Sequence, residues 1–338
     1  MVNTKIGING FGRIGRQVLR NIINNYDDNI ELVAINDLGN PKTNAHLFKY
    51  DSTYGKFKKE VIIEEGNLVI NGKTIKSISE KKPEDINWGK LGVEIIIEST
   101  GIFTDAKNAK RHLENGGEKV IISAPATGED ITIVMGINHN DYDPIKHSII
   151  SNASCTTNCV ALMLKVLHEN FGIDKALMST IHAYTNDQSI LDQQNSDLRR
   201  ARAAGNSIIP TTTGAAKAVT SVIPELLGKI DGMAYRVPVI TGSVTDLTVQ
   251  LSKKSNIKDI NESFKKASEN ELNGFLDISM EPLVSSDYIG SKYSCTIDGL
   301  STSDIGDGFI KVVGWYDNEW AYARRVADLS LHLANNKV

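Results

Sequence analysis

Residues 5–15 read Lys-Ile-Gly-Ile-Asn-Gly-Phe-Gly-Arg-Ile-Gly, a short apolar strand that runs into a glycine-rich turn. The residues after the turn carry apolar side chains at helical spacing, which predicts a helix with one buried face. Gly10 permits a tight turn, Gly12 lets the backbone approach a pyrophosphate, and Gly15 lets the helix pack closely on the strand. The stretch therefore predicts the start of a dinucleotide-binding domain.

A second apolar run, residues 30–35, ends in Asn36-Asp37, and Asp37 lies 22 residues after Gly15. An acid at this distance binds a ribose hydroxyl, and its charge repels a 2′-phosphate. Leu38 is apolar and offers a phosphate no partner. We expect NAD as the preferred cofactor, with NADP used weakly. The alternative is a structural glycine turn with an incidental surface aspartate.

The first half of the chain continues with apolar runs that are typical of buried parallel strands covered by helices. These runs are residues 93–97, 119–123 and 131–134, and a hairpin is expected around Asn71-Gly72. Residues 1–152 are therefore predicted to form a Rossmann-type, doubly wound parallel sheet of α/β class.

The composition is that of an ordinary globular protein, with 338 residues, 41% hydrophobic, 23% charged and a net charge of −4. The acidic balance argues against nucleic acid or an anionic membrane as a main partner. Three cysteines without a framework spacing indicate a reducing compartment. With no signal peptide or membrane span expected, the cytoplasm is the predicted location. No metal site is predicted.

Residues 151–160 read Ser-Asn-Ala-Ser-Cys-Thr-Thr-Asn-Cys-Val, between an apolar strand and a helical pattern. Cys155 is expected at the positive end of the helix dipole, where hydroxyl groups and first-turn amides favour a thiolate. Such surroundings predict a pKa below that of a free cysteine, so Cys155 is a candidate nucleophile. The alternative is a small buried apolar residue. Cys159 is expected to be packing, with a redox role as its alternative.

His182 is the candidate base. A helix from 155 to about 170 descends roughly 22 Å, and a strand over 175–182 climbs back roughly 23 Å. The imidazole is therefore predicted to return to the level of Cys155, as in the usual activation of a thiol nucleophile. A satisfied structural histidine is the alternative.

Arginines with neighbouring hydroxyl groups and glycine suggest phosphate binding in the second half of the chain. The candidates are the arginines of Asp197-Leu-Arg199-Arg200-Ala-Arg202 with the following Thr213-Gly214 and, as a second candidate, Arg236. Solvated surface arginine is the alternative for this composition. A thiol nucleophile beside a hydride acceptor predicts aldehyde oxidation through a hemithioacetal and a thioester.

Five separated motifs resemble those of the phosphorylating glyceraldehyde-3-phosphate dehydrogenase family, and the resemblance covers essentially the whole chain. The motifs are Gly-Ile-Asn-Gly-Phe-Gly-Arg-Ile-Gly-Arg (7–16), Ser-Asn-Ala-Ser-Cys-Thr-Thr-Asn-Cys (151–159), Asp-Leu-Arg-Arg-Ala-Arg-Ala (197–203), Thr-Gly-Ala-Ala-Lys-Ala-Val (213–219) and Trp-Tyr-Asp-Asn-Glu (315–319). The resemblance implies an α+β catalytic domain with a mainly antiparallel sheet over 153–317. It also implies a C-terminal helix, 318–338, that returns to the NAD-binding domain, and a homotetramer.

By the same resemblance Cys155 is the nucleophile, and His182 activates it and relays a proton. The implied NAD contacts, beyond the three glycines and Leu38, are Arg13, Ile14, Asp37, Lys81, Ser123 and Asn318. The implied phosphate subsites are Thr185 with Arg236, and Ser154, Thr156, Arg200, Thr213 and Gly214. The implied reaction converts glyceraldehyde 3-phosphate and inorganic phosphate to 1,3-bisphosphoglycerate.

Two positions depart from the family pattern. Many members have Arg-Asp-Pro where this chain reads Lys81-Lys82-Pro83, which weakens the case for an adenine-side contact at Lys81. NAD-specific relatives often carry proline where Gln194 stands, and a polar side chain there could tolerate a 2′-phosphate. The rival interpretations are an erythrose-4-phosphate dehydrogenase and a non-catalytic nucleotide-sensing or RNA-binding protein.

Overall fold

The computed structural model describes residues 3–337, and the chain divides into two compact units. The first unit comprises the chain up to Ile133, His139–Ala153 and the chain from Ala323 onward. The second unit comprises Val134–Asn138 and Ser154–Tyr322. No helix in residues 3–337 is long and apolar enough to cross a membrane.

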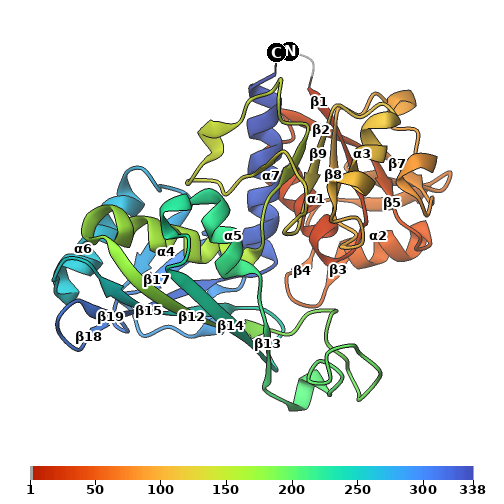
Figure 1. The fold of residues 1–338 in the computed structure, drawn as a ribbon. Helices are drawn as coiled ribbons and strands as arrows, with labels where there is room; N and C mark the ends of the chain where they lie inside the picture. Colours follow the sequence, from red (N-terminus) through yellow and green to blue (C-terminus); the bar gives the residue numbers. More distant parts are fainter. Residues whose placement is uncertain (1–2, 338) are drawn as a thin grey trace. The chain divides into compact units, whose positions relative to one another are not determined.

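A nine-stranded sheet forms the first unit, in the order β10-β11-β9-β8-β1-β2-β7-β6-β5 (Figure 1). All neighbours pair in parallel except the antiparallel pairs β5–β6 and β6–β7. The strands are β1 (Thr4–Asn9), β2 (Ile30–Asn36), β5 (Val61–Glu64), β6 (Asn67–Ile70), β7 (Lys73–Ile78), β8 (Ile95–Glu98), β9 (Lys119–Ile122), β10 (Ile131–Thr132) and β11 (Ile149–Ser151). A separate hairpin joins β3 (Tyr50–Asp51) to β4 (Gly55–Lys56).

Three helices pack around this sheet: α1 (Arg13–Asn25), α2 (Pro41–Lys49) and α3 (Ala106–Glu114) (Figure 1). The apolar face predicted for α1 is buried, with Val18 and Leu19 fully inaccessible to solvent. The hairpin predicted at Asn71-Gly72 is confirmed, since both residues have the positive φ that this turn requires. Short 3₁₀ turns complete the unit: Pro83–Asp85, Gly89–Leu91 and His139–Asp141.

Several strands differ from their predicted bounds, and the run predicted over 131–134, for example, forms a strand only at Ile131–Thr132. The strand predicted from Val93 begins at Ile95, because Trp88 O accepts the amide of Val93 and Gly92 closes a turn there with φ 65°. Helix α2 begins at Pro41, because the Asn40 side chain caps it by accepting the Lys42 amide.

The second unit holds an eight-stranded, mainly antiparallel sheet in the order β13-β14-β12-β15-β19-β17-β16, with β18 on β19. Only the pairs β12–β14 and β16–β17 are parallel. The strands are β12 (Ile173–Ala183), β13 (Ile209–Thr212), β14 (Ile230–Val237), β15 (Ser243–Leu251), β16 (Leu276–Ser279), β17 (Cys295–Asp298), β18 (Ser303–Asp304) and β19 (Phe309–Tyr316). The predicted fold class is thereby confirmed.

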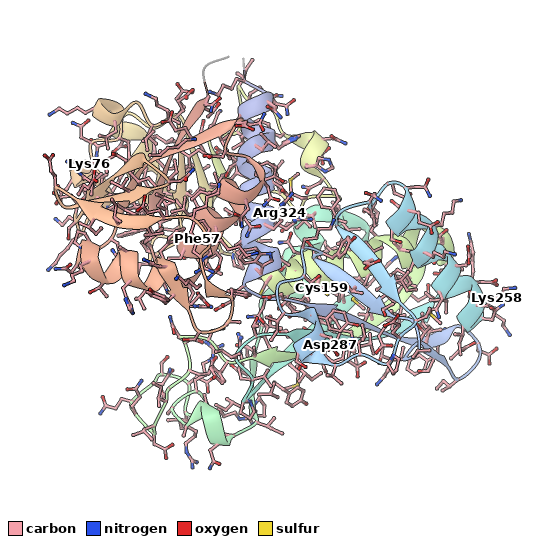
Figure 2. The ribbon with its side chains drawn as sticks, turned by 180° about the vertical axis from the view of Figure 1, so that it is seen from behind. Phe57, Lys76, Cys159, Lys258, Asp287 and Arg324 are labelled. Carbon is pink, nitrogen blue, oxygen red and sulfur yellow. The ribbon has the colours of Figure 1, made fainter. Side chains whose placement is uncertain are left out.

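Helices α4 (Cys155–Phe171), α5 (Ala215–Val222) and α6 (Ile257–Glu269) cover one face of the second sheet (Figure 1). Strand β15 alternates buried and half-buried residues, as expected when only one face of a sheet is covered. Cys159, labelled in Figure 2, is buried on α4, and its sulfur lies 3.8 Å from Gly314 O on β19. Further 3₁₀ turns are Ala204–Asn206, Pro224–Leu226 and Ser285–Tyr288.

The C-terminal helix α7 (Trp320–Asn335) belongs to the first unit from Ala323 onward. The Tyr26 hydroxyl, just beyond α1, donates to Asp328. The guanidinium of Arg324, labelled in Figure 2, lies 4.8 Å from the centre of the Tyr26 ring and also donates to Asp328. These contacts hold α7 against the end of α1.

Gly314 on β19 has no room for a side chain. A Cβ built there would lie 2.7 Å from Cys295 Sγ and 2.8 Å from Met163 Sδ. We expect Gly314→Ala to lower the free energy of unfolding by about 1–3 kcal/mol, the usual cost of overpacking a core. In a protein that already carries Cys295→Ala, Gly314→Ala should lower the free energy of unfolding by less, because the Cys295 sulfur that the new Cβ would contact is absent. Urea unfolding measures both.

The control is Gly205→Ala, where a Cβ would meet no atom within 4 Å. Its unfolding free energy should stay within about 0.5 kcal/mol of the wild-type value. Equal costs of Gly314→Ala in the two backgrounds would show that the Cys295 sulfur is not the obstacle.

Candidate active site

The turn between β11 and α4 places Cys155 at the first position of a 17-residue helix. Ala153 adopts a positive φ of 55°, a strained conformation for a residue with a side chain. Ser154 caps the helix, since its hydroxyl oxygen accepts the Thr157 amide at 3.0 Å. The cysteine therefore lies among the amides of the first helical turn.

Strand β12 brings His182 to the cysteine, as the spacing predicted. Cys155 Sγ lies 3.3 Å from His182 Nε2, and His182 is 3% exposed. Strand β14 pairs with β12 in parallel, so that Arg236 stands directly opposite His182. The Arg236 Nη1 atom consequently lies 2.6 Å from His182 Nδ1. One register of two strands thus places an imidazole and a guanidinium beside the thiol.

The Nδ1 atom of His182 has two competing neighbours. Ala183 O lies 2.7 Å away and accepts a proton carried by Nδ1, which leaves the Nε2 lone pair facing the sulfur. Arg236 can only donate, and its Nη1 also lies 3.2 Å from Ala183 O. The tautomer that acts as a base toward Cys155 is the one held by Ala183 O.

The prediction of a lowered thiol pKa is wrong for this structure. Desolvation raises the pKa of the Cys155 thiol, although Arg236, Thr156 and the first-turn amides oppose that rise. The same burial, with the adjacent Arg236 cation, lowers the pKa of His182 to about 3. The helix terminus thus offsets desolvation only in part, and a neutral imidazole faces a neutral thiol.

Arg200 lies in a cluster of carboxylates and hydroxyl groups. Its guanidinium donates to Asp187 at 2.5 Å and to Thr211 Oγ1 at 2.8 Å, and it lies 3.4 Å from Asp197. The cluster fixes the guanidinium against β13, the strand that leads into α5.

Thr213 and Gly214 form the turn between β13 and α5. Thr213 Oγ1 accepts the Ala215 amide at 3.2 Å, and Gly214 is the N-cap of α5, which packs on α4. A helix N-terminus favours an anion, so the turn suits the phosphate contact predicted for these two residues.

Three other predicted residues have the following surroundings. The Thr185 amide donates to Gln188 Oε1 at 2.8 Å, in the loop that follows β12. Asn318 is buried in the second unit and accepts from the hydroxyl of Ser243 at 2.8 Å. Gln194 is exposed on the loop between β12 and β13.

The glycine turn after β1 leaves space where a cofactor would approach. A Cβ on Gly12 would meet no atom within 4 Å, whereas one on Gly15 would lie 2.3 Å from Gly10 O. Gly10 has φ 93°, and a Cβ on it would lie 2.6 Å from the Thr100 amide nitrogen. Close packing at two glycines and open space at the third match the roles predicted for the turn.

Asp37 directly follows β2 and faces the glycine turn. Its Oδ2 accepts the Phe11 amide at 2.8 Å, and its Oδ1 accepts the Gly39 amide at 2.7 Å. Leu38 is 61% exposed beside it. The carboxylate is therefore fixed beside the turn with an apolar neighbour.

The remaining cofactor candidates belong to the same unit. Arg13 is paired with Asp51 at 2.6 Å, and Ile14 is half-buried beside it on α1. Ser123 directly follows β9, and its amide donates to the backbone oxygen of Glu98 at 2.9 Å. Lys81 is exposed just before the 3₁₀ turn Pro83–Asp85.

Comparison with known proteins shows the family. Residues 4–106 match the profile of the glyceraldehyde 3-phosphate dehydrogenase NAD binding domain, and residues 154–318 match that of the C-terminal domain. The chain is 57% identical over 331 residues to a glyceraldehyde-3-phosphate dehydrogenase of Geobacillus stearothermophilus, covering 98% of each chain. It is 56% identical to glyceraldehyde-3-phosphate dehydrogenase 2 of Streptomyces avermitilis, again over 98% of each chain.

The chain belongs to the glyceraldehyde-3-phosphate dehydrogenase family. It is an NAD-dependent enzyme of that family. The open space at Gly12 and the first-turn amides of α1 suit a pyrophosphate, and Asp37 suits a ribose diol.

The sequence did not identify one residue that lies beside His182, Tyr316 at the end of β19. Its buried hydroxyl bridges Thr156 Oγ1 at 2.9 Å and Thr180 Oγ1 at 2.8 Å. Its ring lies 6.0 Å from the His182 ring, edge to face. Tyr316 stands in a family motif and at a buried position of an alternating strand, but neither signal specifies its partners.

The low pKa of His182 predicts acid sensitivity of this dehydrogenase. The unfolded chain binds a proton at this histidine below about pH 6.5, whereas the folded chain does so only near pH 3. Stability therefore falls as pH falls through that window. His182→Gln should lose less stability than the wild type between about pH 7 and pH 5. Urea unfolding at the two pH values measures the difference.

His46→Gln serves as the matched control, because His46 is exposed on α2. This variant should follow the wild-type pH dependence. If the stability of His182→Gln follows it too, the imidazole takes up its proton at the same pH in the folded and the unfolded chain, which would contradict the low pKa of His182.

Proposed function

We propose that this protein oxidises D-glyceraldehyde 3-phosphate to 1,3-bisphosphoglycerate, with NAD as the oxidant and inorganic phosphate as the acceptor. The observation that carries the proposal is the 3.3 Å contact of Cys155 Sγ with His182 Nε2, with Arg236 beside the imidazole. A nucleophile, a base and an anion-binding side chain in one place suit addition to a phosphorylated aldehyde.

In the first half-reaction the Cys155 sulfur bonds to the aldehyde carbon. His182 takes the thiol proton and passes it to the aldehyde oxygen, which gives a hemithioacetal. His182 Nε2 then accepts the hydroxyl proton as the C–H bond breaks with its electron pair, which leaves a thioester on Cys155. Bound NAD supplies the hydride acceptor for this oxidation.

In the second half-reaction a phosphate oxygen attacks the thioester carbon and the C–S bond breaks. The sulfur leaves with the electron pair and recovers a proton from His182, so the thiol is restored. The attacking phosphate is assigned to Ser154, Thr156, Arg200, Thr213 and Gly214. The phosphate of the substrate is assigned to Thr185 and Arg236.

The decisive experiment follows reduced-nicotinamide absorbance with glyceraldehyde 3-phosphate and NAD, with and without inorganic phosphate. We expect sustained turnover only with phosphate, because the thioester needs an acceptor. Cys155→Ser should abolish turnover, whereas the matched change Cys295→Ser, at a cysteine buried on β17, should retain it.

Two outcomes would contradict the proposal. A single-turnover burst that phosphate cannot relieve would keep the thiol chemistry but require another acceptor. A higher kcat/KM with erythrose 4-phosphate than with glyceraldehyde 3-phosphate would show that the protein is an erythrose-4-phosphate dehydrogenase.

We further propose that NAD is preferred over NADP, because the Asp37 carboxylate is fixed beside the glycine turn and Leu38 offers no cation. The kcat/KM with NADP should be at least about tenfold lower than the kcat/KM with NAD. Asp37→Asn should reduce this difference, because it removes the charge that repels the 2′-phosphate of NADP. Asp28→Asn, an exposed change on the same unit, should leave the ratio unchanged. Comparable kcat/KM values for the two cofactors in the wild type would overturn this preference.

A cytoplasmic homotetramer is the proposed state of the enzyme. Support for self-association comes from the loop after β12, which exposes Ile190 by 90%, Leu191 by 75% and Leu198 by 82%. Apolar side chains gathered on one exposed loop are typical of an interaction surface. Support for the cytoplasm comes from the three cysteines, which are all present as free thiols.

A further inference from the structure

A buried network of polar side chains lies within the first unit, beneath the cofactor edge. Trp88 Nε1 lies 2.9 Å from His112 Nδ1 on α3, and His112 Nε2 lies 3.0 Å from Glu98 Oε2 at the end of β8. Trp88 and His112 are fully inaccessible to solvent, and Glu98 is 2% exposed. None of the three takes part in the proposed reaction.

The donor and acceptor properties of these side chains determine which atoms of the network carry protons. An indole nitrogen only donates, so His112 Nδ1 must accept and the ring proton must be on Nε2. His112 Nε2 then donates to Glu98, whose oxygen acts as the acceptor. A neutral histidine thus supports a buried carboxylate, and Trp88 selects the tautomer that makes this support available.

Glu98 accepts three further hydrogen bonds. Asn9 Nδ2 donates to its Oε2 at 2.5 Å, and the amide and hydroxyl of Thr100 donate to its Oε1 at 2.8 and 2.5 Å. With His112, donors occupy about four lone-pair sites, the full capacity of a carboxylate. The buried charge is therefore stabilised by hydrogen bonds.

The network continues across the sheet to β2 and β7. Asn36 Nδ2 donates to Asn9 Oδ1 at 2.7 Å, and the Asn36 side chain exchanges two hydrogen bonds with the backbone of Glu80, just beyond β7. Asn36 directly precedes Asp37. The network therefore joins the carboxyl ends of four neighbouring strands, β8, β1, β2 and β7.

This edge of the sheet is where a dinucleotide binds. The strand order runs from β1 outward through β2 on one side and through β8 on the other, so the switch point lies between β1 and β8. The turns that follow these strands touch there, since a Cβ on Gly10 would lie 2.6 Å from the Thr100 amide nitrogen. Ser99 Oγ also donates to Gly10 O at 2.7 Å.

We propose that His112 is a positioning residue for NAD. Through Glu98, it holds the Thr100 turn and Asn9 in the geometry that the glycine turn needs, although it lies outside the cofactor site. Without the His112 donor, Glu98 Oε2 keeps a single hydrogen bond, from Asn9, in a buried place, so the carboxylate and the groups bound to it lose part of the restraint on their positions. The turns that follow β1 and β8 would then become ordered only when NAD binds. The free energy needed to order them would lower the affinity for NAD.

The test compares two substitutions of His112 by titration calorimetry with NAD and by steady-state kinetics. His112→Leu removes both hydrogen bonds and should raise the Kd and KM for NAD about tenfold. At saturating NAD its kcat should fall by less than about twofold, because NAD then orders the turns. His112→Gln can accept from Trp88 and donate to Glu98, so its Kd should stay within about threefold of the wild-type value.

Leu113→Ala is the matched control, because Leu113 neighbours His112 on α3 and packs against the apolar core of the same unit. It should lower thermal stability without changing the Kd for NAD. A wild-type Kd in a folded His112→Leu protein would reduce His112 to a structural role and overturn the proposal.

Trp88→Phe keeps the inference testable if His112→Leu does not fold. It deletes the indole N–H that selects the tautomer, so the Kd for NAD should rise by about threefold or more. An unchanged Kd in this variant would show that the His112 tautomer does not control the cofactor edge.

Discussion

The contact between Cys155 and His182 depends on two elements of matched length. Helix α4 carries the chain away from the thiol, and β12 carries it back across the sheet until His182 meets the sulfur. The parallel pairing of β12 with β14 then places Arg236 directly opposite His182. Three chemically different side chains thus meet because of one helix, one strand and one register.

The same physical constraint governs both units, because polar groups buried at strand ends need complete sets of hydrogen bonds. In the second unit the Tyr316 hydroxyl joins Thr156 to Thr180 beside the imidazole. In the first unit, Glu98 accepts hydrogen bonds from Asn9 on β1, from His112 on α3 and from Thr100 in the turn after β8. Each network fixes a turn on which ligand chemistry depends.

Local sequence order predicted much of this architecture. Spacing along one or two elements determines the glycine turn, the position of the acid after β2 and the return of His182 to the thiol. Such spacing can be predicted from the periodicity of apolar residues in the sequence. The partners of Tyr316 lie 160 and 136 residues away and those of His112 lie 24 and 14 residues away, on elements whose register only the fold supplies. The predicted direction of the Cys155 pKa was wrong because a helix N-terminus is visible in sequence whereas desolvation is not.

Arg236 links recognition of an anion to the strength of the base. Burial makes protonation of the imidazole unfavourable, and the positive charge of Arg236, 2.6 Å from His182 Nδ1, adds to this cost. An anion bound to Arg236 offsets that charge and makes the imidazole more basic. In the proposed reaction, an aldehyde without a phosphate would leave the imidazole a weaker proton acceptor, so selectivity for phosphorylated substrates would reside in the rate of proton transfer as well as in binding.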